Sequence, residues 1–223
     1  MNADLTGLVD LQVNGAGGHD LTSDPDRLWD VATALSAYGV VAFLPTVITS
    51  DPAVAARAFE VLDAGPPTGW SGATPLGLHL EGPMLSPERK GANPEEWLRP
   101  PSLDLVDGWS RDAGVAMVTL APELPGALDV VETLVSRGVV VSIGHTAATA
   151  DQVASAVEAG ASCLTHLGNA MPEMTTREPG PVGAALGSGS LVAGLIVDGH
   201  HLAADFVRAA WRALGPDRFL SVS

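Results

Sequence analysis

The stretch VVVSIGHTAATADQVASAVEAGASCLT, residues 139–165, contains the unit that decides the fold. An apolar, β-branched run at 139–143 is followed by an Ala-rich helical pattern at 150–159 and a second apolar run at 161–165. Both runs are continuously apolar rather than alternating, which is typical of parallel strands buried on both faces. Gly160 stands where helices commonly end. The segment therefore predicts a strand–helix–strand unit of a parallel sheet.

The same alternation recurs along the whole chain. Eight strands in all, joined by helical segments, indicate an α/β fold of the (β/α)₈ TIM type, because a doubly wound sheet usually ends at about five or six strands. We expect one barrel domain over residues 1–223, which ends in the eighth strand and lacks the last helix. The other strands are predicted at 7–13, 40–44, 75–80, 115–120, 191–197 and 219–222, and the other helices at 26–38, 52–62, 127–136 and 203–214.

The composition limits the classes of protein to which the chain can belong. Apolar residues make up 46% of the 223 residues, which is enough to bury a core. The net charge of −15 argues against binding to nucleic acid or an anionic membrane, since both require clustered cations. The sequence shows no secretory signal or membrane-length apolar run, and its single cysteine, Cys163, fits a reducing compartment. We therefore expect a cytoplasmic protein.

Three potential metal ligands follow predicted strands. Glu81 ends the third strand, His145 follows the fifth and His166 follows the sixth. Working side chains of such barrels lie at the carboxyl ends of the strands, so these three should meet at one rim. One carboxylate and two imidazoles are a ligand set for a catalytic divalent cation. A strand-end histidine can equally bond only to the backbone, so position alone leaves metal binding and a structural role open.

Two further features near the predicted rim suit a binding site. The segment 84–101 is longer than a simple connection and predicts a lid or a substrate-binding excursion. Arg177 is an isolated cation in an acidic chain, which suits a phosphate clamp. A surface ion pair of Arg177 with Glu173 or Glu178 has equal weight.

The motifs of the chain, taken in order, resemble those of the N-acetylglucosamine-6-phosphate deacetylase family of the amidohydrolase superfamily. The resemblance covers nearly the whole chain, and HLEGP together with HLxNAM at this spacing is a specific signal. The motifs are VDLQVNGAGG (9–18), HLEGP (79–83), KGA (90–92), GHT (144–146), THLGNAM (165–171), TREPG (176–180) and DGHH (198–201).

The resemblance implies a single divalent cation held by Glu81, His145 and His166, with zinc as the first choice and iron(II) or manganese as alternatives. Gln12 and Asn14 replace the His-x-His that other amidohydrolases use for a second metal. It also implies an amino-sugar phosphate as the small-molecule partner and a homodimer, because the family's arginine at the position of Arg177 reaches the phosphate of a neighbouring subunit. The implied substrate contacts come from Ala92, Asn169, Ala170, Arg177, Asp198 and His201.

The implied reaction is hydrolysis of the acetamide of N-acetylglucosamine 6-phosphate to glucosamine 6-phosphate and acetate, in amino-sugar catabolism or recycling. In the family, an aspartate at the end of the eighth strand transfers the proton, and this chain stops at Ser223, before that position. We therefore assign no catalytic residue. The family's small β-sandwich domain also has no counterpart here, and Asn93 stands where the KGA loop usually has histidine, which should weaken one sugar contact.

Three other functions remain open from the sequence. The chain could be a catalytically impaired remnant that binds metal or sugar phosphate without turnover. It could be another amidohydrolase, such as a cyclic amidase or a deaminase, although these usually need the His-x-His pair. A phosphate-binding barrel of unrelated chemistry would leave Glu81, His145 and His166 without a metal.

We expect residues 1–223 alone to release acetate from N-acetylglucosamine 6-phosphate about 10²–10⁴-fold more slowly than a full-length relative, because an acid–base group commonly contributes that much. An acetate-release assay measures the rate, and metal content tells a binding remnant from an inert chain. A rate comparable to that of the full-length relative would contradict this expectation.

Overall fold

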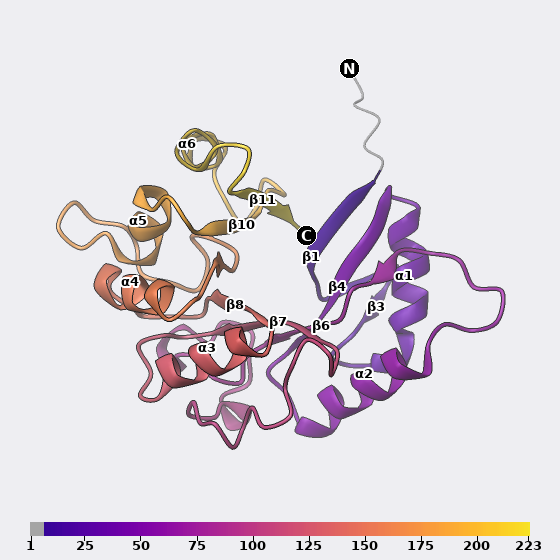
Figure 1. Ribbon diagram of the computed structural model, residues 1–223. Helices are drawn as coiled ribbons and strands as arrows, with labels where there is room; N and C mark the ends of the chain where they lie inside the picture. Colours follow the sequence, from indigo (N-terminus) through magenta and orange to yellow (C-terminus); the bar gives the residue numbers. More distant parts are fainter. Residues whose placement is uncertain (1–6) are drawn as a thin grey trace.

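The computed structural model describes residues 7–223 and shows a nearly closed barrel of eight parallel strands (Figure 1). Each strand pairs in parallel with the next one along the series, so the eight predicted strands are confirmed. In spatial order they are β1 (Leu8–Val13), β4 (Val40–Ile48), β6 (Leu78–Glu81), β7 (Val115–Leu120), β8 (Val140–Ile143), β9 (Cys163–Leu164), β10 (Val192–Ile196) and β11 (Phe219–Val222).

The ring is completed by side chains rather than by a backbone ladder. Within residues 7–223, no ladder joins β11 to β1, although the two strands lie side by side (Figure 1). The hydroxyl group of Ser223 donates a hydrogen bond to Asp10 Oδ2 at 2.7 Å. Burial raises the pKa of Asp10, so this carboxyl group sits in a partly desolvated seam.

Helices cover the outside of the strands (Figure 1). The predicted helices are confirmed with shifts of a few residues at their ends, as α1 (Leu28–Ser36), α2 (Pro52–Ala64), α3 (Ala127–Ser136), α4 (Ala150–Glu158) and α6 (Ala204–Leu214). Local chemistry explains where they begin. Asp51 caps α2 by accepting from the Ala53 N–H at 2.9 Å, and Thr149 and Gln152 form a reciprocal capping box on α4.

One helix differs from the prediction. Helix α5 (Gly180–Gly187) was not predicted, because its sequence GPVGAALG is rich in glycine and proline and has no amphipathic spacing. The connection from β6 to β7, where the sequence predicts no helix, contains no α-helix. It has the short 3₁₀ turns Pro87–Arg89 and Glu95–Trp97. The two-residue strand β5 (Thr74–Pro75) lies before β6, in the connection that follows α2. A two-residue hairpin, β2 (Gly15–Ala16) and β3 (His19–Asp20), follows β1.

The long segment predicted as a lid begins as a packed connection. Met84, Leu85 and Ser86 are buried, and the Ser86 N–H donates to the carbonyl oxygen of His145 at 2.9 Å. The segment is therefore held against the rim of the barrel at its start, directly beside one of the predicted metal ligands.

Strand β6 shows how the fold sorts apolar and polar side chains. Leu78 and Leu80 pack in the main core between the strands and the helices. His79 and Glu81 alternate with them and therefore point to the opposite face, the barrel interior. Polar side chains on one face and a continuous apolar core on the other place a potential site at the carboxyl end of the barrel. No helix within residues 7–223 has both the length and the apolar character needed to cross a membrane.

The core between α3 and the strands should dominate stability. Leu134 of α3 is fully buried, whereas Leu128 on the same helix is 37% exposed. We expect Leu134→Ala to lower the free energy of unfolding by about 2–5 kcal/mol, because it removes buried methyl groups and leaves a cavity. Leu128→Ala is the matched control and should cost less than about 1 kcal/mol. Chemical denaturation measures both, and equal losses would show that this helix face does not carry the core.

Candidate metal centre

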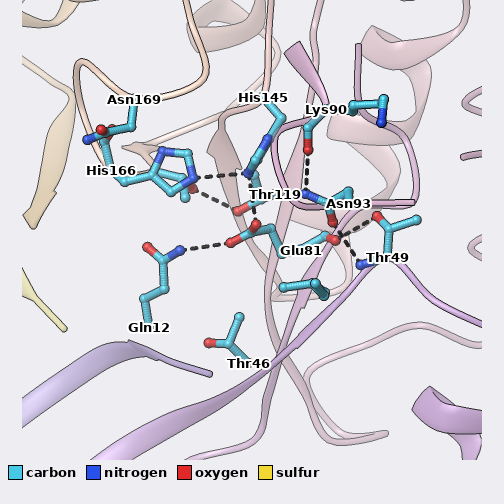
Figure 2. A network of polar contacts seen from close by, with 12 residues as sticks. Gln12, Thr46, Thr49, Glu81, Lys90, Asn93, Thr119, His145, His166 and Asn169 are labelled. Carbon is cyan, nitrogen blue, oxygen red and sulfur yellow. Dashed lines mark hydrogen bonds and ion pairs between the residues drawn. The ribbon is translucent and has the colours of Figure 1, made fainter. Parts of the chain in front are cut away.

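Glu81, His145 and His166 converge at the carboxyl-terminal rim of the barrel (Figure 2). One ligand atom from each residue lies within 4.8 Å of the other two. His145 Nε2 is 2.8 Å from Glu81 Oε1 and 3.0 Å from His166 Nε2. All three side chains are buried. The predicted meeting of these residues at one rim is therefore confirmed, and the group could hold a metal ion.

Both histidines occupy unusual backbone conformations. The φ angle is 46° at His145 and 34° at His166, in the left-handed region that residues other than glycine seldom adopt. Each residue follows the end of its strand, β8 or β9. Such conformations cost about 1–3 kcal/mol each and cluster at functional sites, where the surrounding structure enforces them.

Hydrogen bonding fixes the proton on His145. Its Nδ1 lies 2.9 Å from the carbonyl oxygen of Arg89, which can only accept, so Nδ1 carries a hydrogen and donates it. Nε2 faces the carboxylate of Glu81: it donates a hydrogen bond when the ring is protonated and offers a lone pair when the ring is neutral. A backbone carbonyl behind an imidazole is a common way to orient a metal-binding histidine.

A second hydrogen bond orients Glu81. Gln12 donates from Nε2 to Glu81 Oε2 at 2.8 Å, which leaves Oε1 toward the histidines (Figure 2). The Thr49 hydroxyl group donates to the backbone carbonyl oxygen of Glu81 at 3.0 Å. From the sequence, Gln12 was notable only because it replaces a histidine that could bind a second metal. Its contact with Glu81 joins β1 to β6 and could not be inferred from spacing.

The electrostatics of the cluster keep Glu81 charged. Burial by itself would raise the pKa of Glu81, but the hydrogen bond from His145 and the nearby imidazoles lower the pKa to about 2. Burial lowers the pKa of His166, which favours its neutral form. For His145, burial acts in the same direction, but the adjacent carboxylate outweighs it and raises the pKa. The site thus combines a buried negative charge with imidazole nitrogens.

The donor set fits a divalent cation. Glu81 Oε1 and the Nε2 atoms of His145 and His166 face one another, and a shared proton can bridge only one of these pairs at a time. His166 Nδ1 is buried and lacks a hydrogen-bond partner within residues 7–223. A cation would satisfy the three facing lone pairs together. One carboxylate oxygen and two imidazole nitrogens suit zinc, iron(II) or manganese.

Three predicted substrate-binding residues lie beside this cluster. The N–H and the side-chain amide of Asn169 both donate to the carbonyl oxygen of His166. Ala170, with φ at 50°, accepts from the N–H of Thr146, the residue after His145. Ala92 is exposed, and the residue directly before it, Gly91, packs against the His145 ring.

Asp198 and His201 form a separate exposed pair. His201 Nδ1 lies 2.7 Å from Asp198 Oδ2, and Asp198 Oδ1 accepts from the N–H groups of His200 and His201. These backbone hydrogen bonds hold the pKa of Asp198 well below its usual range. Within residues 7–223, the structure shows no hydrogen bond from this pair to Glu81, His145 or His166.

Arg177 is exposed, and within the described part of the chain it forms no ion pair. The structure thus does not show the alternative of a surface pair with Glu173 or Glu178. Its guanidinium group is available to an anion, although nothing in the structure places it against the metal cluster.

Asn93 has a structural contact that the sequence did not reveal. It is buried, its Oδ1 accepts from the Thr49 N–H at 3.0 Å, and its Nδ2 donates to the Lys90 carbonyl oxygen at 2.9 Å (Figure 2). Asn93 therefore ties the loop of residues 90–92 to the end of β4. The only signal in the sequence was its place directly after the KGA motif.

A cavity of about 700 Å³ lies between α2 and residues 97–109. Phe59, Trp97 and Trp109 line it, and it reaches Glu81 where β6 ends. Neither histidine of the cluster is part of its lining. The donor cluster, rather than this apolar cavity, is the place where a cation and a polar substrate could meet.

Gly91 gives a test of how tightly the loop supports His145. A Cβ atom at Gly91 would lie 3.1 Å from His145 Cε1 and 3.4 Å from Nδ1, and φ is +57°. We expect Gly91→Ala to displace the ring and to weaken divalent-cation affinity about 10-fold or more. Gly108→Ala is the matched control, because Gly108 also has a positive φ, of +76°, but open space around it. Competition with a chelator measures both affinities, and equal values for the two variants would refute the contact.

Comparison with known proteins found relatives that are named as deacetylases of phosphorylated amino sugars. No model of a known protein family matched the chain. The N-acetylglucosamine-6-phosphate deacetylase of Bacillus subtilis is 36% identical, over 98% of this chain and 57% of the relative. The N-acetylgalactosamine-6-phosphate deacetylase of a Shewanella strain is 38% identical over 98% and 56%. The chain thus spans about half the length of the curated relatives it matches.

Solved structures agree with the sequence relatives. The N-acetylglucosamine-6-phosphate deacetylase of Thermotoga maritima superimposes with a TM-score of 0.87 at 28% identity, over 98% of this chain and 59% of that one. A mutant of the Mycobacterium smegmatis enzyme in complex with N-acetyl-D-glucosamine-6-phosphate gives 0.86 at 34% identity, over 98% and 57%. Over the part of those proteins that it spans, the chain is similar in sequence and in fold to N-acetylglucosamine-6-phosphate deacetylases.

Proposed function

We propose that this chain forms the metal-binding barrel of an enzyme that hydrolyses the acetamide of N-acetylglucosamine 6-phosphate to glucosamine 6-phosphate and acetate. The observation that carries the proposal is the convergence of Glu81, His145 and His166 at the rim of the barrel. The names of the relatives supply the class of substrate.

One divalent cation, with zinc as the first choice, would be held by Glu81 Oε1 and by the Nε2 atoms of His145 and His166. Bound there, it would polarise a carbonyl group and make water acidic enough to supply hydroxide near neutral pH. Gln12 occupies the other oxygen of Glu81, which supports a single cation rather than a bridged pair.

The residues around the cluster would bind and orient the sugar phosphate. Ala92, Asn169 and Ala170 are adjacent to the two histidines and are suited to contact the sugar. Asp198 fixes the orientation of His201 by accepting from its Nδ1–H, and Nε2 would donate to the acetamide oxygen when the ring is protonated. The exposed guanidinium group of Arg177 would bind the phosphate of a second copy of the chain in a homodimer.

In the reaction, the amide C–N bond breaks, a C–O bond forms to the oxygen of water, and the amine nitrogen gains a proton. Within residues 7–223, the cluster contains one carboxylate, Glu81, and it is bound to Gln12 and His145. We therefore assign this proton transfer to no residue of the chain. The family resemblance gives it to an aspartate that follows the position of Ser223.

The 4-epimer, N-acetylgalactosamine 6-phosphate, is a second candidate substrate. The Shewanella relative named for that activity is as similar to this chain as the relatives named for N-acetylglucosamine 6-phosphate. Both substrates carry the same acetamide and phosphate groups, so the metal cluster alone does not separate them.

The test combines metal content with acetate release by the full-length protein. We expect about one divalent cation per chain and acetate release from at least one of the two phosphorylated sugars, but much less from unphosphorylated N-acetylglucosamine. Glu81→Gln should lower cation affinity at least about 100-fold, because even partners of metal ligands contribute 10–100-fold. Glu88→Gln, an exposed residue of the following turn, is the control.

The possible outcomes separate the alternatives. A protein without a bound cation, or an equal effect of both substitutions, would refute the metal site. Full metal content without acetate release from either sugar phosphate would favour a binding protein without turnover.

A further inference from the structure

A chain of hydrogen-bonded side chains lies inside the barrel near the metal cluster. His79 Nε2 is 2.7 Å from Thr119 Oγ1, which is 2.7 Å from Thr165 Oγ1, which in turn is 2.6 Å from the hydroxyl group of Ser142. All four side chains are buried, and we call them the hydroxyl chain. It crosses from β6 through β7 to β8 and the end of β9.

One arrangement of the hydrogen atoms gives every member of the hydroxyl chain a partner. The Thr46 hydroxyl group accepts from the Val13 N–H and donates to the Leu44 carbonyl oxygen, so it can accept from His79 Nδ1 at 3.2 Å. His79 Nε2 then accepts from Thr119. Thr119 in turn accepts from the Thr165 hydroxyl group, and Thr165 accepts from the Ser142 hydroxyl group. In this arrangement every polar side-chain atom of the hydroxyl chain has a hydrogen-bond partner. Removing one hydroxyl group therefore leaves a neighbouring atom unpaired.

Packing alone does not explain these residues. The interior of such a barrel is usually filled by branched apolar side chains, and valine has nearly the same shape as threonine. A buried polar network costs stability unless all its members are paired, and it favours one arrangement of the elements that carry them. Threonine at positions 119 and 165 therefore points to a geometric requirement.

The members of the chain lie just before the metal donors in sequence. His79 precedes Glu81 by two residues, Ser142 precedes His145 by three, and Thr165 directly precedes His166. Every strand that carries a donor therefore also carries a member of the hydroxyl chain. Figure 2 shows Thr119 near Glu81 and the two histidines.

The pairing between β8 and β9 ends just before the two histidines. β8 and β9 pair through Ser142 with Cys163 and Ile143 with Leu164, and the Thr165 N–H donates to the Ile143 carbonyl oxygen at 2.8 Å. Both histidines come after these pairs, in left-handed backbone. The ladder between β8 and β9 therefore ends before the two histidines, and side-chain contacts contribute to the distance between the two rings.

Gly144 shows that the hydroxyl chain packs directly against the backbone before His145. A Cβ atom at Gly144 would lie 2.7 Å from Thr119 Cγ2 and 2.8 Å from Thr165 Cβ. The two threonines thus pack against Gly144, the residue directly before His145. Their spacing determines where that backbone can lie.

We infer that the hydroxyl chain is a positioning device, which holds β6, β8 and β9 in the alignment at which Glu81, His145 and His166 meet. Thr119 is its central positioning residue, because β7 lies between the strands that carry Glu81 and His145. The inference rests on the metal site proposed above and extends it to residues that are not themselves ligands.

The test compares Thr119→Val with Thr119→Ser in the full-length protein. Valine keeps the shape and removes the hydroxyl group, whereas serine keeps the hydroxyl group. We expect Thr119→Val to weaken the affinity for Zn²⁺ about 10-fold or more, measured by competition with a chelator, and Thr119→Ser to stay within about twofold of the parent. The visible absorption of bound Co²⁺ should change in the valine variant only, because it reports ligand geometry.

Val130→Thr is the control for a general loss of stability. Val130 is fully buried in α3, away from the barrel interior, and the change adds a hydroxyl group at constant shape. We expect it to lower the unfolding temperature but to leave Zn²⁺ affinity unchanged. An equal loss of affinity in this control would overturn the inference.

The remaining outcomes separate the two proposals. If the parent protein binds no divalent cation, the metal site itself fails. If the parent binds Zn²⁺ and Thr119→Val binds it within about twofold, only the positioning role fails. If Thr119→Val does not fold, Ser142→Ala, at the end of the chain, is judged by the same affinity threshold.

Discussion

The buried carboxylate of Glu81 is the constraint on which the rest of the site depends. A charge removed from water is costly unless partners compensate for it. Gln12 donates to one oxygen of Glu81 and His145 faces the other, so the carboxylate has a single open direction. His166 lies next to His145 and completes the group around that direction. The carboxylate oxygen and the two imidazole nitrogens that face this direction favour the binding of a cation at the rim of the barrel.

The site is supported by layers with different tasks. Close to the donors, the Arg89 carbonyl and the Gln12 amide orient individual side chains. Within the barrel, hydroxyl groups and His79 join the strands. The strained backbone at both histidines needs this surrounding support, since neither conformation would be favoured in an isolated loop. By contrast, Arg177, which is proposed to bind the phosphate, is exposed and lies in a loop.

The sequence by itself determined the barrel and the position of the cluster. Continuous apolar runs followed by helical patterns gave all eight strands, and strand ends carrying Glu81, His145 and His166 predicted a shared rim. These inferences hold because apolar periodicity and the polarity of parallel strands are local properties of the chain. Helix α5 could not be predicted from the sequence, because its glycine-rich segment forms a helix only where neighbouring elements bury it.

Only the tertiary structure decided which side chains support the cluster. Gln12 meets Glu81 from 69 residues away, and Thr119 meets Thr165 from 46. Asn93, which the sequence marked only as a departure from a motif, fastens the neighbouring loop to β4. Such partners come from different strands, and their contacts depend on the register and closure of the barrel. No spacing along the chain records that geometry, so it became visible only once the strands were placed around one axis.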